Sequence, residues 1–345
     1  MAIKWKLGNS FKPKTVLSHI GKERSSPSKG QKAVFNGLSY FQYGPVLQSM
    51  LAFPVSARHI DHTALVSQAL SHVQGELTPE SFLAEINSQL KKEFSQKEKE
   101  LFVLTSISLE NSVSLGSCTV DGVKIKFSAK GFPRAFKGSR EQIIGKHSTP
   151  ATESPESFTR VIIPVKAKSS EVAYSTAIRA LDIYRAIWCL HSNVRLEIIG
   201  QSWKPINRIR LGSIHTIHEK NGAAQHDFWF EPNNFYVQEY KPKHPENVKK
   251  NIRTIVRRLN GCSYREALYS ALIQYVRALD ESNPSSALLR LWSAVERLTS
   301  PGKGVNENVV RRCAFLRAEP DIAVQELEHL RICRNRFTHE GIESP

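Results

Sequence analysis

Hydrophobic and polar residues follow two different periods along the first two thirds of the chain. Apolar residues spaced by three and four share one face of a helix, and this spacing predicts helices from about residue 63, at 79–93 and at 169–191. Short apolar runs and one strictly alternating run predict strands at 101–108, 123–128, 158–166, 194–199, 209–217 and 228–230. We therefore expect an α+β region over residues 35–240.

Capping, turn and proline residues add detail to these predicted elements. Thr78 is a candidate N-cap of the helix 79–93. The runs 101–108 and 123–128 are bounded by turn residues, so an antiparallel pair is the simplest arrangement for them. Pro164 cannot donate a hydrogen bond to a neighbouring strand, so its strand is expected at an edge or a bulge. The composition of 148–157 predicts a loop or linker.

Beyond Pro245 the pattern changes to helical spacing alone. Helices are predicted at 246–259, 263–281, 284–299, 305–317 and 321–338. A run of helices without strands is typical of a helical bundle. We therefore expect a basic, partly flexible segment 1–34, the α+β region 35–240 and an all-α domain 241–345.

The charge of the chain indicates an anionic partner. The sequence holds 48 Lys and Arg against 32 Asp and Glu, a formal net charge of +16. Such a field attracts polyanions, and salt weakens the attraction. RNA, DNA or an acidic partner is expected, beside the alternative of a basic surface that binds nothing. The predicted helix 246–259 and its approach carry a candidate phosphate track of Lys241, Lys243, Lys249, Lys250, Arg253, Arg257 and Arg258.

Residue usage disfavours membrane, disulfide-bonded and metal-binding proteins. No run approaches the roughly 18 consecutive apolar residues of a membrane span, and residues 1–6 lack the apolar core of a secretory signal, so a cytoplasmic protein is expected. The five cysteines are scattered, without Cys-x-x-Cys spacing. His59-x-x-His62 and His215-x-x-His218 lack companion ligands. We expect no metal and no cofactor.

The candidate chemistry lies in the segment 331–341. Arg334 follows Leu330 and Leu327 at spacings of four and seven, so it continues an apolar stripe. A charged side chain on such a stripe is unusual and indicates a specific role. His339 follows five positions later, and five residues turn a straight helix through about 500°. The two side chains therefore share a site only if the helix bends or ends near Thr338, or if a second copy of the chain contributes.

These residues also have ordinary structural interpretations. A histidine near a helix end often bonds the last carbonyls, and the arginine on the stripe can form a salt bridge with Glu296 or Glu328. Glu296 itself borders the apolar stripe of the helix 284–299 and can be a surface carboxylate paired with an arginine. Arg331 and Arg336 either extend a phosphate contact or are solvated surface.

The C-terminal segment resembles a known family. Residues 334–339, Arg-Asn-Arg-Phe-Thr-His, match the motif of HEPN domains (higher eukaryotes and prokaryotes nucleotide-binding): Arg, a polar residue, three of any kind, His. Residues 288–298 resemble the Trp-and-Glu helix of the Apea-like HEPN branch of prokaryotic defence proteins, and 309–316 fit the intervening helix. Family members usually continue past the motif into a helix opened by His-Gly, whereas here the order is His339-Glu340-Gly341.

The resemblance, which covers 241–345 only, implies a metal-independent endoribonuclease. It implies a homodimer through the C-terminal domain, a toxin-like anti-phage role with tRNA or mRNA as substrate, and a phage-derived trigger or partner protein. Arg334, His339 and Asn335 would be catalytic, supported by Glu296, Arg331 and Arg336. An imidazole suits proton transfer and a guanidinium suits the phosphate. The alternatives are a noncatalytic HEPN module that binds nucleic acid or protein, and a DNA-binding regulator.

Overall fold

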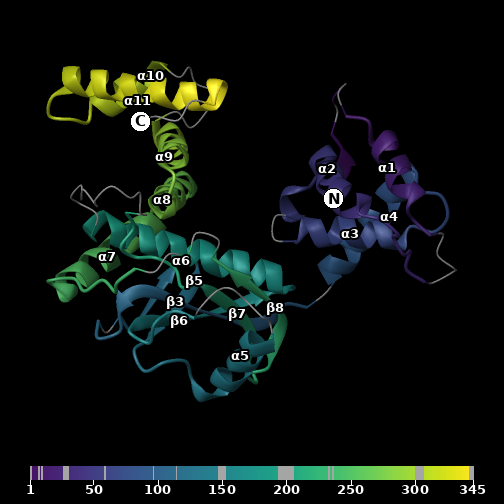
Figure 1. Cartoon of the computed structure of the whole chain (residues 1–345), viewed down its shortest axis with the longest axis horizontal. Helices are drawn as coiled ribbons and strands as arrows, with labels where there is room; N and C mark the ends of the chain where they lie inside the picture. The colour runs from purple at the N-terminus through teal and green to yellow at the C-terminus, as the bar shows by residue number, and fades with distance from the viewer. Residues whose placement is uncertain are drawn as a thin grey trace. The chain divides into compact units, whose positions relative to one another are not determined.

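The computed structural model covers 345 residues in two compact units (Figure 1). The structure describes every residue except 1, 7, 9–10, 26–30, 58–59, 96, 114, 147–152, 193–205, 232–233, 235–236, 300–306 and 342–345. The first unit comprises residues 1–99 with 166–172, and the second 100–165 with 173–345. The units thus divide near residue 100, whereas the sequence pattern placed divisions at 34/35 and 240/241.

The first unit is a small helical assembly. It contains β1 (Lys4–Trp5), α1 (Pro13–Lys22), α2 (Ser39–Met50), β2 (Leu51–Ala52), a 3-10 turn (Val55–Ala57), α3 (His62–His72) and α4 (Pro79–Ser95). Leu17 and Ile20 of α1 are fully buried with Leu65 and Ile86 in one core. The segment 1–34 is therefore largely a packed part of this unit, because α1 carries its own apolar stripe.

Local sequence signals account for the helices of this unit. The helix predicted from about residue 63 is α3, and Asp61 caps it by accepting a hydrogen bond from the Ala64 amide at 2.9 Å. The predicted cap of α4 is confirmed, since the Ser81 amide donates to Thr78 Oγ1 at 3.2 Å. These caps satisfy amides that a helix N-terminus leaves without partners.

A six-stranded sheet forms the base of the second unit. Its strand order is β4-β5-β6-β3-β7-β8. The bounds are β3 (Lys99–Glu110), β4 (Ser117–Val120), β5 (Val123–Ser128), β6 (Phe158–Ala167), β7 (Ile214–Glu219) and β8 (Ala224–Phe230). The predicted strand at 194–199 lies outside the described residues, as does part of the predicted loop 148–157. The chain is therefore α+β, as its patterns predict.

The predicted pairing of two strands is wrong. β3 and β5 are not a pair, because β6 lies between them and β5 instead forms a hairpin with β4. The turn of that hairpin is Asp121-Gly122, both with positive φ, as the tight turns between paired strands require. Of the two places expected for the strand with Pro164, only the edge is excluded, because β6 lies between β5 and β3; its register with β5 runs from Arg160 to Ile162 and ends before Pro164.

Two helices cover opposite faces of the sheet (Figure 1). On one face lies α5 (Arg134–Lys146), whose Phe136 packs against Phe102 of β3. On the other lies α6 (Ser170–Ser192), the long helix predicted at 169–191, whose Tyr184 packs against Phe127 of β5. Alternate residues of each strand point to opposite faces, which is why one sheet serves two cores.

The five C-terminal helices occur where the sequence predicts them. They are α7 (Pro245–Asn260), α8 (Arg265–Asp280), α9 (Pro284–Thr299), α10 (Glu307–Ala314) and α11 (Pro320–Glu340). Asn283 caps α9 through a 2.9 Å hydrogen bond from the Ser286 amide, with Pro284 in the first turn. Among the described helices, none combines the length and apolar character that crossing a bilayer demands.

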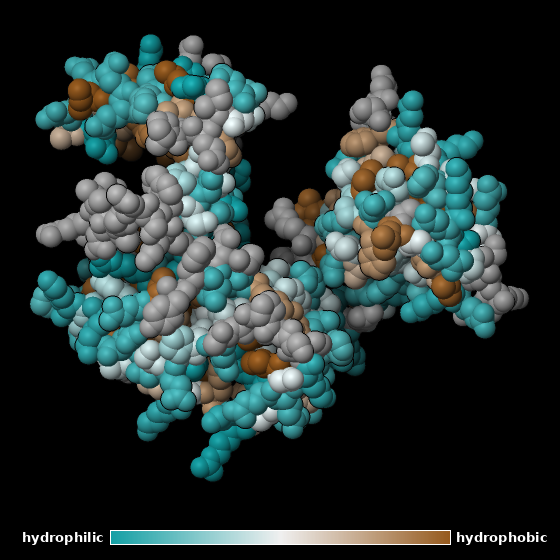
Figure 2. All heavy atoms as spheres, in the orientation of Figure 1, coloured by the Kyte–Doolittle hydropathy of each residue, from teal (hydrophilic) through white to brown (hydrophobic). Residues whose placement is uncertain are grey.

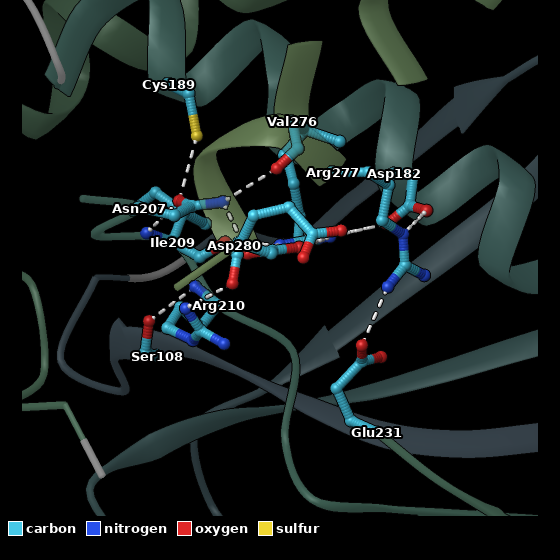
Figure 3. Close-up of polar contacts among 12 residues, drawn as sticks. Ser108, Asp182, Cys189, Asn207, Ile209, Arg210, Glu231, Val276, Arg277 and Asp280 are labelled. Carbon is cyan, nitrogen blue, oxygen red and sulfur yellow. Dashed lines mark hydrogen bonds and ion pairs between the residues drawn. The ribbon is translucent and has the colours of Figure 1, made fainter. Parts of the chain in front are cut away.

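A buried ionic network joins α8 to the sheet and to α6 (Figure 3). Arg185 of α6 is fully buried and binds two carboxylates, Asp182 at 2.6 Å and Asp280 at 2.9 Å. Arg277 of α8 binds Asp182 at 2.6 Å and Glu231, which follows β8, at 2.8 Å. Among the C-terminal helices, α8 is therefore tied by buried ion pairs to α6 and to the end of β8.

The environment of this network keeps Glu231 ionised. Burial alone would raise the pKa of Glu231, but the interaction with the His215 ring, 3.8 Å away, and the charge of Arg277 outweigh burial and lower this pKa to about 2. The adjacent Asn207 donates to Asp280 at 2.8 Å and accepts from the Cys189 thiol at 3.1 Å. Each charge of the network thus has an opposite charge or a dipole within reach, which a buried ion requires.

We predict that Arg185→Met costs about 3–5 kcal/mol of stability, because it leaves Asp182 and Asp280 buried without their cation. Urea unfolding followed by the fluorescence of buried Trp188 measures the change. The matched control is Lys137→Met, which removes an exposed 3.9 Å pair with Glu141 and should cost less than about 0.5 kcal/mol. Equal costs for the two variants would contradict this account.

A second prediction concerns pH. His218 is fully buried, and burial lowers its pKa to about 4, below the ordinary value near 6.5. The unfolded chain therefore binds the extra proton first, and stability is lost as pH falls from about 6.5 to 4, by at most about 3 kcal/mol. In the His218→Gln variant, the unfolding free energy should fall less steeply than in the parent as the pH is lowered across that window. The two slopes should differ by up to about 1.4 kcal/mol per pH unit. Identical slopes would refute the assignment.

Candidate functional site

Three side chains from α9 and α11 form a chain of polar contacts. Trp292 and Glu296 lie four residues apart on α9, and the indole Nε1 of Trp292 donates to Glu296 Oε1 at 2.8 Å. The same carboxylate oxygen lies 3.6 Å from Nη2 of Arg334 on α11. A tryptophan that is itself buried therefore fixes the carboxylate that faces the arginine.

The packing beneath these contacts explains their place. Trp292 forms a small core with Val309 and Val310 of α10, against which Val324 and Leu327 of α11 pack. Arg334 lies on the same side of α11 about two turns beyond Leu327, as the spacing of seven residues predicts. Its side chain is 24% exposed, so the guanidinium lies at the rim between core and solvent. A charge at a rim keeps part of its hydration while remaining positioned by the core.

Asn335 is the second polar neighbour of the arginine. Its Oδ1 accepts a hydrogen bond from Arg334 Nη1 at 2.8 Å. The guanidinium is thus contacted on two sides, by an amide and by a carboxylate. The predicted salt bridge of Arg334 with Glu296 is present, whereas Glu328 instead pairs with Arg331.

His339 lies on a different side of α11. The helix continues unbroken to Glu340, and Thr338 Oγ1 donates to the Arg334 carbonyl at 2.8 Å (Figure 1). The helix ends at Glu340, only two residues past Thr338, but His339 still lies within it, so this end does not bring His339 to the side of Arg334. The C-cap is Gly341, whose φ of 68° suits glycine. On this geometry the two side chains point about 140° apart, so one chain alone does not bring them together.

The surroundings of His339 also bear on its role. Its side chain is exposed, and within the described residues it forms no hydrogen bond and no ion pair. An imidazole of this kind does not cap the last carbonyls of the helix in the described structure. It is accessible to a partner or a substrate.

The supporting arginines have local carboxylate partners. Arg331 Nε lies 2.7 Å from Glu328, and both side chains are about one-third exposed. Arg336 Nε lies 3.8 Å from Glu340 on the exposed side of α11. Both pairs connect neighbouring turns of one helix, an arrangement that adds a few tenths of a kcal/mol in exposed positions. Neither pair brings its arginine into contact with Arg334 or His339.

The candidate phosphate track lies on α7. Lys249, Lys250, Arg253 and Arg257 line a groove along this helix, together with Glu246, Asn247 and Thr254. Arg258 is exposed but does not line the groove. Ile252 and Val256 occupy the buried side of α7, which explains why the cations are held on its outer side.

Of the two histidine pairs with metal-like spacing, only His215 and His218 are both described, and they do not face a common site. His215 Nδ1 lies 2.8 Å from Thr105 Oγ1, whereas His218 contacts Ser139 and Thr216, so the two rings serve different faces of the sheet. His59 lies outside the described residues. No group of three or more potential metal-ligating side chains occurs among the residues that the structure describes.

Comparisons of the chain with protein-family models, with curated proteins and with solved structures each found no match. The chemical interpretation therefore rests on side chains and geometry. Arg334 is a positioned cation at the surface, and His339 is an accessible imidazole that a single chain does not align with it.

Sequence reasoning missed two parts of this region. The indole hydrogen bond from Trp292 was detectable in principle, because residues four apart on a helix are neighbours. The ionic network of Arg185, Arg277 and Asp280 was not, because its two halves lie on α6 and α8, far apart in the sequence, and nothing in the local pattern links the two helices.

We predict measurable coupling between Glu296 and Arg334. A double-mutant cycle with Glu296→Ala and Arg334→Ala, measured by urea unfolding, should give an interaction of about 0.5–1 kcal/mol, since both side chains are partly shielded. The cycle Arg336→Ala with Glu340→Ala is the control: that pair is more than half exposed, and we expect below about 0.3 kcal/mol. A larger value in the control would contradict a specially positioned Arg334.

Proposed function

We propose that the chain is a metal-independent endoribonuclease whose site combines Arg334, Asn335 and His339. The observation that carries the proposal is the half-buried guanidinium of Arg334, held by Glu296 and Asn335 at the rim of the α9–α11 core. A guanidinium fixed in this way suits two oxygens of a phosphate group. Resemblance of the C-terminal segment to HEPN ribonucleases supports the same reaction class.

The reaction needs no group beyond those of RNA and the protein. His339 acts as the base that removes the proton of the 2′-hydroxyl, whose oxygen then forms a bond to the adjacent phosphorus. The bond from phosphorus to the 5′-oxygen breaks, and that oxygen takes a proton from an imidazolium. The products are a 2′,3′-cyclic phosphate and a free 5′-hydroxyl. Arg334 stabilises the extra negative charge on the phosphate oxygens during the exchange.

A second copy of the chain completes this site in the proposal. One chain holds its Arg334 and His339 on sides of α11 about 140° apart. A twofold dimer brings the arginine of one chain and the histidine of its partner to a shared interface. Hydrophobic side chains visible over α10 and α11 support burial by a second copy (Figure 2). The exposed members in this region are Phe315, Leu316, Ile322, Leu330 and Ile332.

The biological role follows from the resemblance and belongs to the proposal. A dimeric ribonuclease of this kind serves as a toxin-like defence effector that cuts tRNA or mRNA during phage infection. The first unit and the sheet region then receive the trigger, a phage-derived molecule or a partner protein. Arg331 and Arg336 contribute charge near the substrate without direct catalytic roles, since each already pairs with a carboxylate.

The second candidate function is a noncatalytic HEPN module that binds nucleic acid or a protein. The observation that favours it is the ion pair between Arg334 and Glu296, which satisfies the guanidinium without any substrate. In that case the His339→Ala variant retains binding, and no product forms under any condition.

Complementation between two inactive variants tests the composite site. We expect Arg334→Ala and His339→Ala each to lower cleavage of cellular RNA at least about 100-fold, measured in EDTA by sequencing of fragment ends. Mixing the two variants after subunit exchange should restore about a quarter of the parent activity. Random pairing makes half the dimers mixed, and each mixed dimer holds one complete site of two.

The outcomes separate the alternatives. Full inactivity of the mixture beside an active parent would show that both groups act within one chain, against the proposed interface. A parent that cuts no RNA, alone or in extract from infected cells, would favour the noncatalytic module. Variants as active as the parent would overturn the ribonuclease proposal itself.

A further inference from the structure

One face of α7 carries four cations, of which Lys250, Arg253 and Arg257 are exposed, whereas the side chain of Lys249 is only 11% exposed. Lys249, Arg253, Arg257 and Lys250 fall within about 100° of one another around the helix axis. They line the groove along α7, where Asn247 and Thr254 add neutral polar groups. From Lys250 to Arg257 the helix rises about 10 Å. The face is thus a short row of positive charge rather than a single point.

Most of these cations have no acidic partner, which sets them apart from other arginines of the chain. Lys249 pairs with Glu246 at 2.7 Å. Within the described residues, no carboxylate lies in ion-pair distance of Lys250, Arg253 or Arg257. By contrast, four arginines of α6, α8 and α9 pair with carboxylates: Arg179, Arg185, Arg277 and Arg290. Three adjacent cations left without counterions on one face mark a surface suited to an extended anion.

The chemistry of the face favours a nucleic acid over a membrane. No large hydrophobic residue of α7 is exposed in the described structure, and its apolar residues Ile252 and Val256 are buried. An interfacial helix needs an apolar side to enter the lipid. A row of cations with polar neighbours instead matches the backbone of a nucleic acid, where each phosphate carries one charge.

An exposed aromatic residue lies just beyond the C-terminal end of α7. Tyr264 is 66% exposed and directly precedes α8. The helix ends at Asn260, so only three residues separate it from this ring. An aromatic ring that protrudes into solvent offers a face on which an unpaired base can stack, whereas the bases of a duplex are already stacked.

We propose that the α7 face and Tyr264 form a docking track for single-stranded RNA. The backbone lies along Lys250, Arg253 and Arg257, and one base stacks on Tyr264. The inference deepens the proposed function and rests on it for the choice of RNA. The track binds the strand away from the α9–α11 site, so substrates with an unpaired segment beside the cleaved linkage are preferred.

Binding measured on an uncleaved probe tests the track. The full-length His339→Ala chain is titrated into a fluorescein-labelled single-stranded RNA, and anisotropy gives the Kd at several salt concentrations. Replacing Lys250, Arg253 and Arg257 together by alanine should lower the slope of log Kd against log salt by about 2, since each phosphate contact on a single strand contributes about 0.7. Tyr264→Ala should weaken binding about 10-fold without changing that slope.

Matched variants show whether these effects belong to the track. The double variant Lys124→Ala with Lys126→Ala removes two exposed cations of β5, a strand outside the track. It should leave the slope of log Kd against log salt unchanged, except for the small effect of a lower net charge. Tyr264→Phe keeps the ring and should keep the affinity. Circular dichroism melting of each variant checks that the fold is retained, which is expected because all the altered side chains are exposed.

Each result supports or overturns the inference. An unchanged salt slope in the triple variant, or an equal loss from the β5 variant, would overturn the cationic track. Equal binding of a duplex RNA of the same length, or full affinity in Tyr264→Ala, would overturn the preference for an unpaired strand. If the track behaves as expected but the parent chain cuts no RNA, the docking surface stands and the ribonuclease proposal fails.

Discussion

The structure of the second unit depends on one fully buried arginine. Arg185 binds Asp182 on its own helix and Asp280 at the end of α8, and Arg277 extends the same network to Glu231 beyond β8. Buried ion pairs contribute little net stability, but their geometry is demanding, because a displaced partner leaves a bare charge in the interior. The network therefore fixes the orientation of α8 against α6 and the sheet. Through the packing of α9 on α8 and of α10 and α11 on α9, it also fixes where Arg334 lies.

A continuous helix is the second constraint on function. Because α11 runs without a break to Glu340, the guanidinium of Arg334 and the imidazole of His339 face different directions. The helix thus separates two roles. The side of α11 that packs on α9 positions Arg334 through Glu296 and Trp292, and the outer side leaves His339 free to meet another molecule. Within one chain, therefore, the side chains of Arg334 and His339 do not meet.

Helices and their caps could be predicted from the sequence, because each depends on residues within one element. Contacts between segments far apart in the sequence could not. The C-terminal helices, α4 with its Thr78 cap and α6 could be predicted because apolar spacing and caps are local. The β4–β5 hairpin was missed although Asp121-Gly122 is a strong turn signal, because Ser117–Val120 is short and not strongly apolar. The order of strands could not be predicted, since any apolar strand can pair with any other. The sequence predicts either Glu296 or Glu328 as the salt-bridge partner of Arg334. Only the packing of the helices shows that the partner is Glu296.

The way α8 is anchored has a consequence for the modularity of the chain. Divided by its sequence pattern, the protein offers an obvious excision point near residue 241, and the fragment that follows carries all five C-terminal helices. That cut passes through the ionic network. Asp280 would lose its partner Arg185, and Arg277 would lose its partners Asp182 and Glu231. A surface of α8 that is interior in the whole chain would then be exposed and charged. The five C-terminal helices are thus not a module that can be transplanted alone, and a fragment that keeps the ion pairs of α8 must also include α6 and the end of β8.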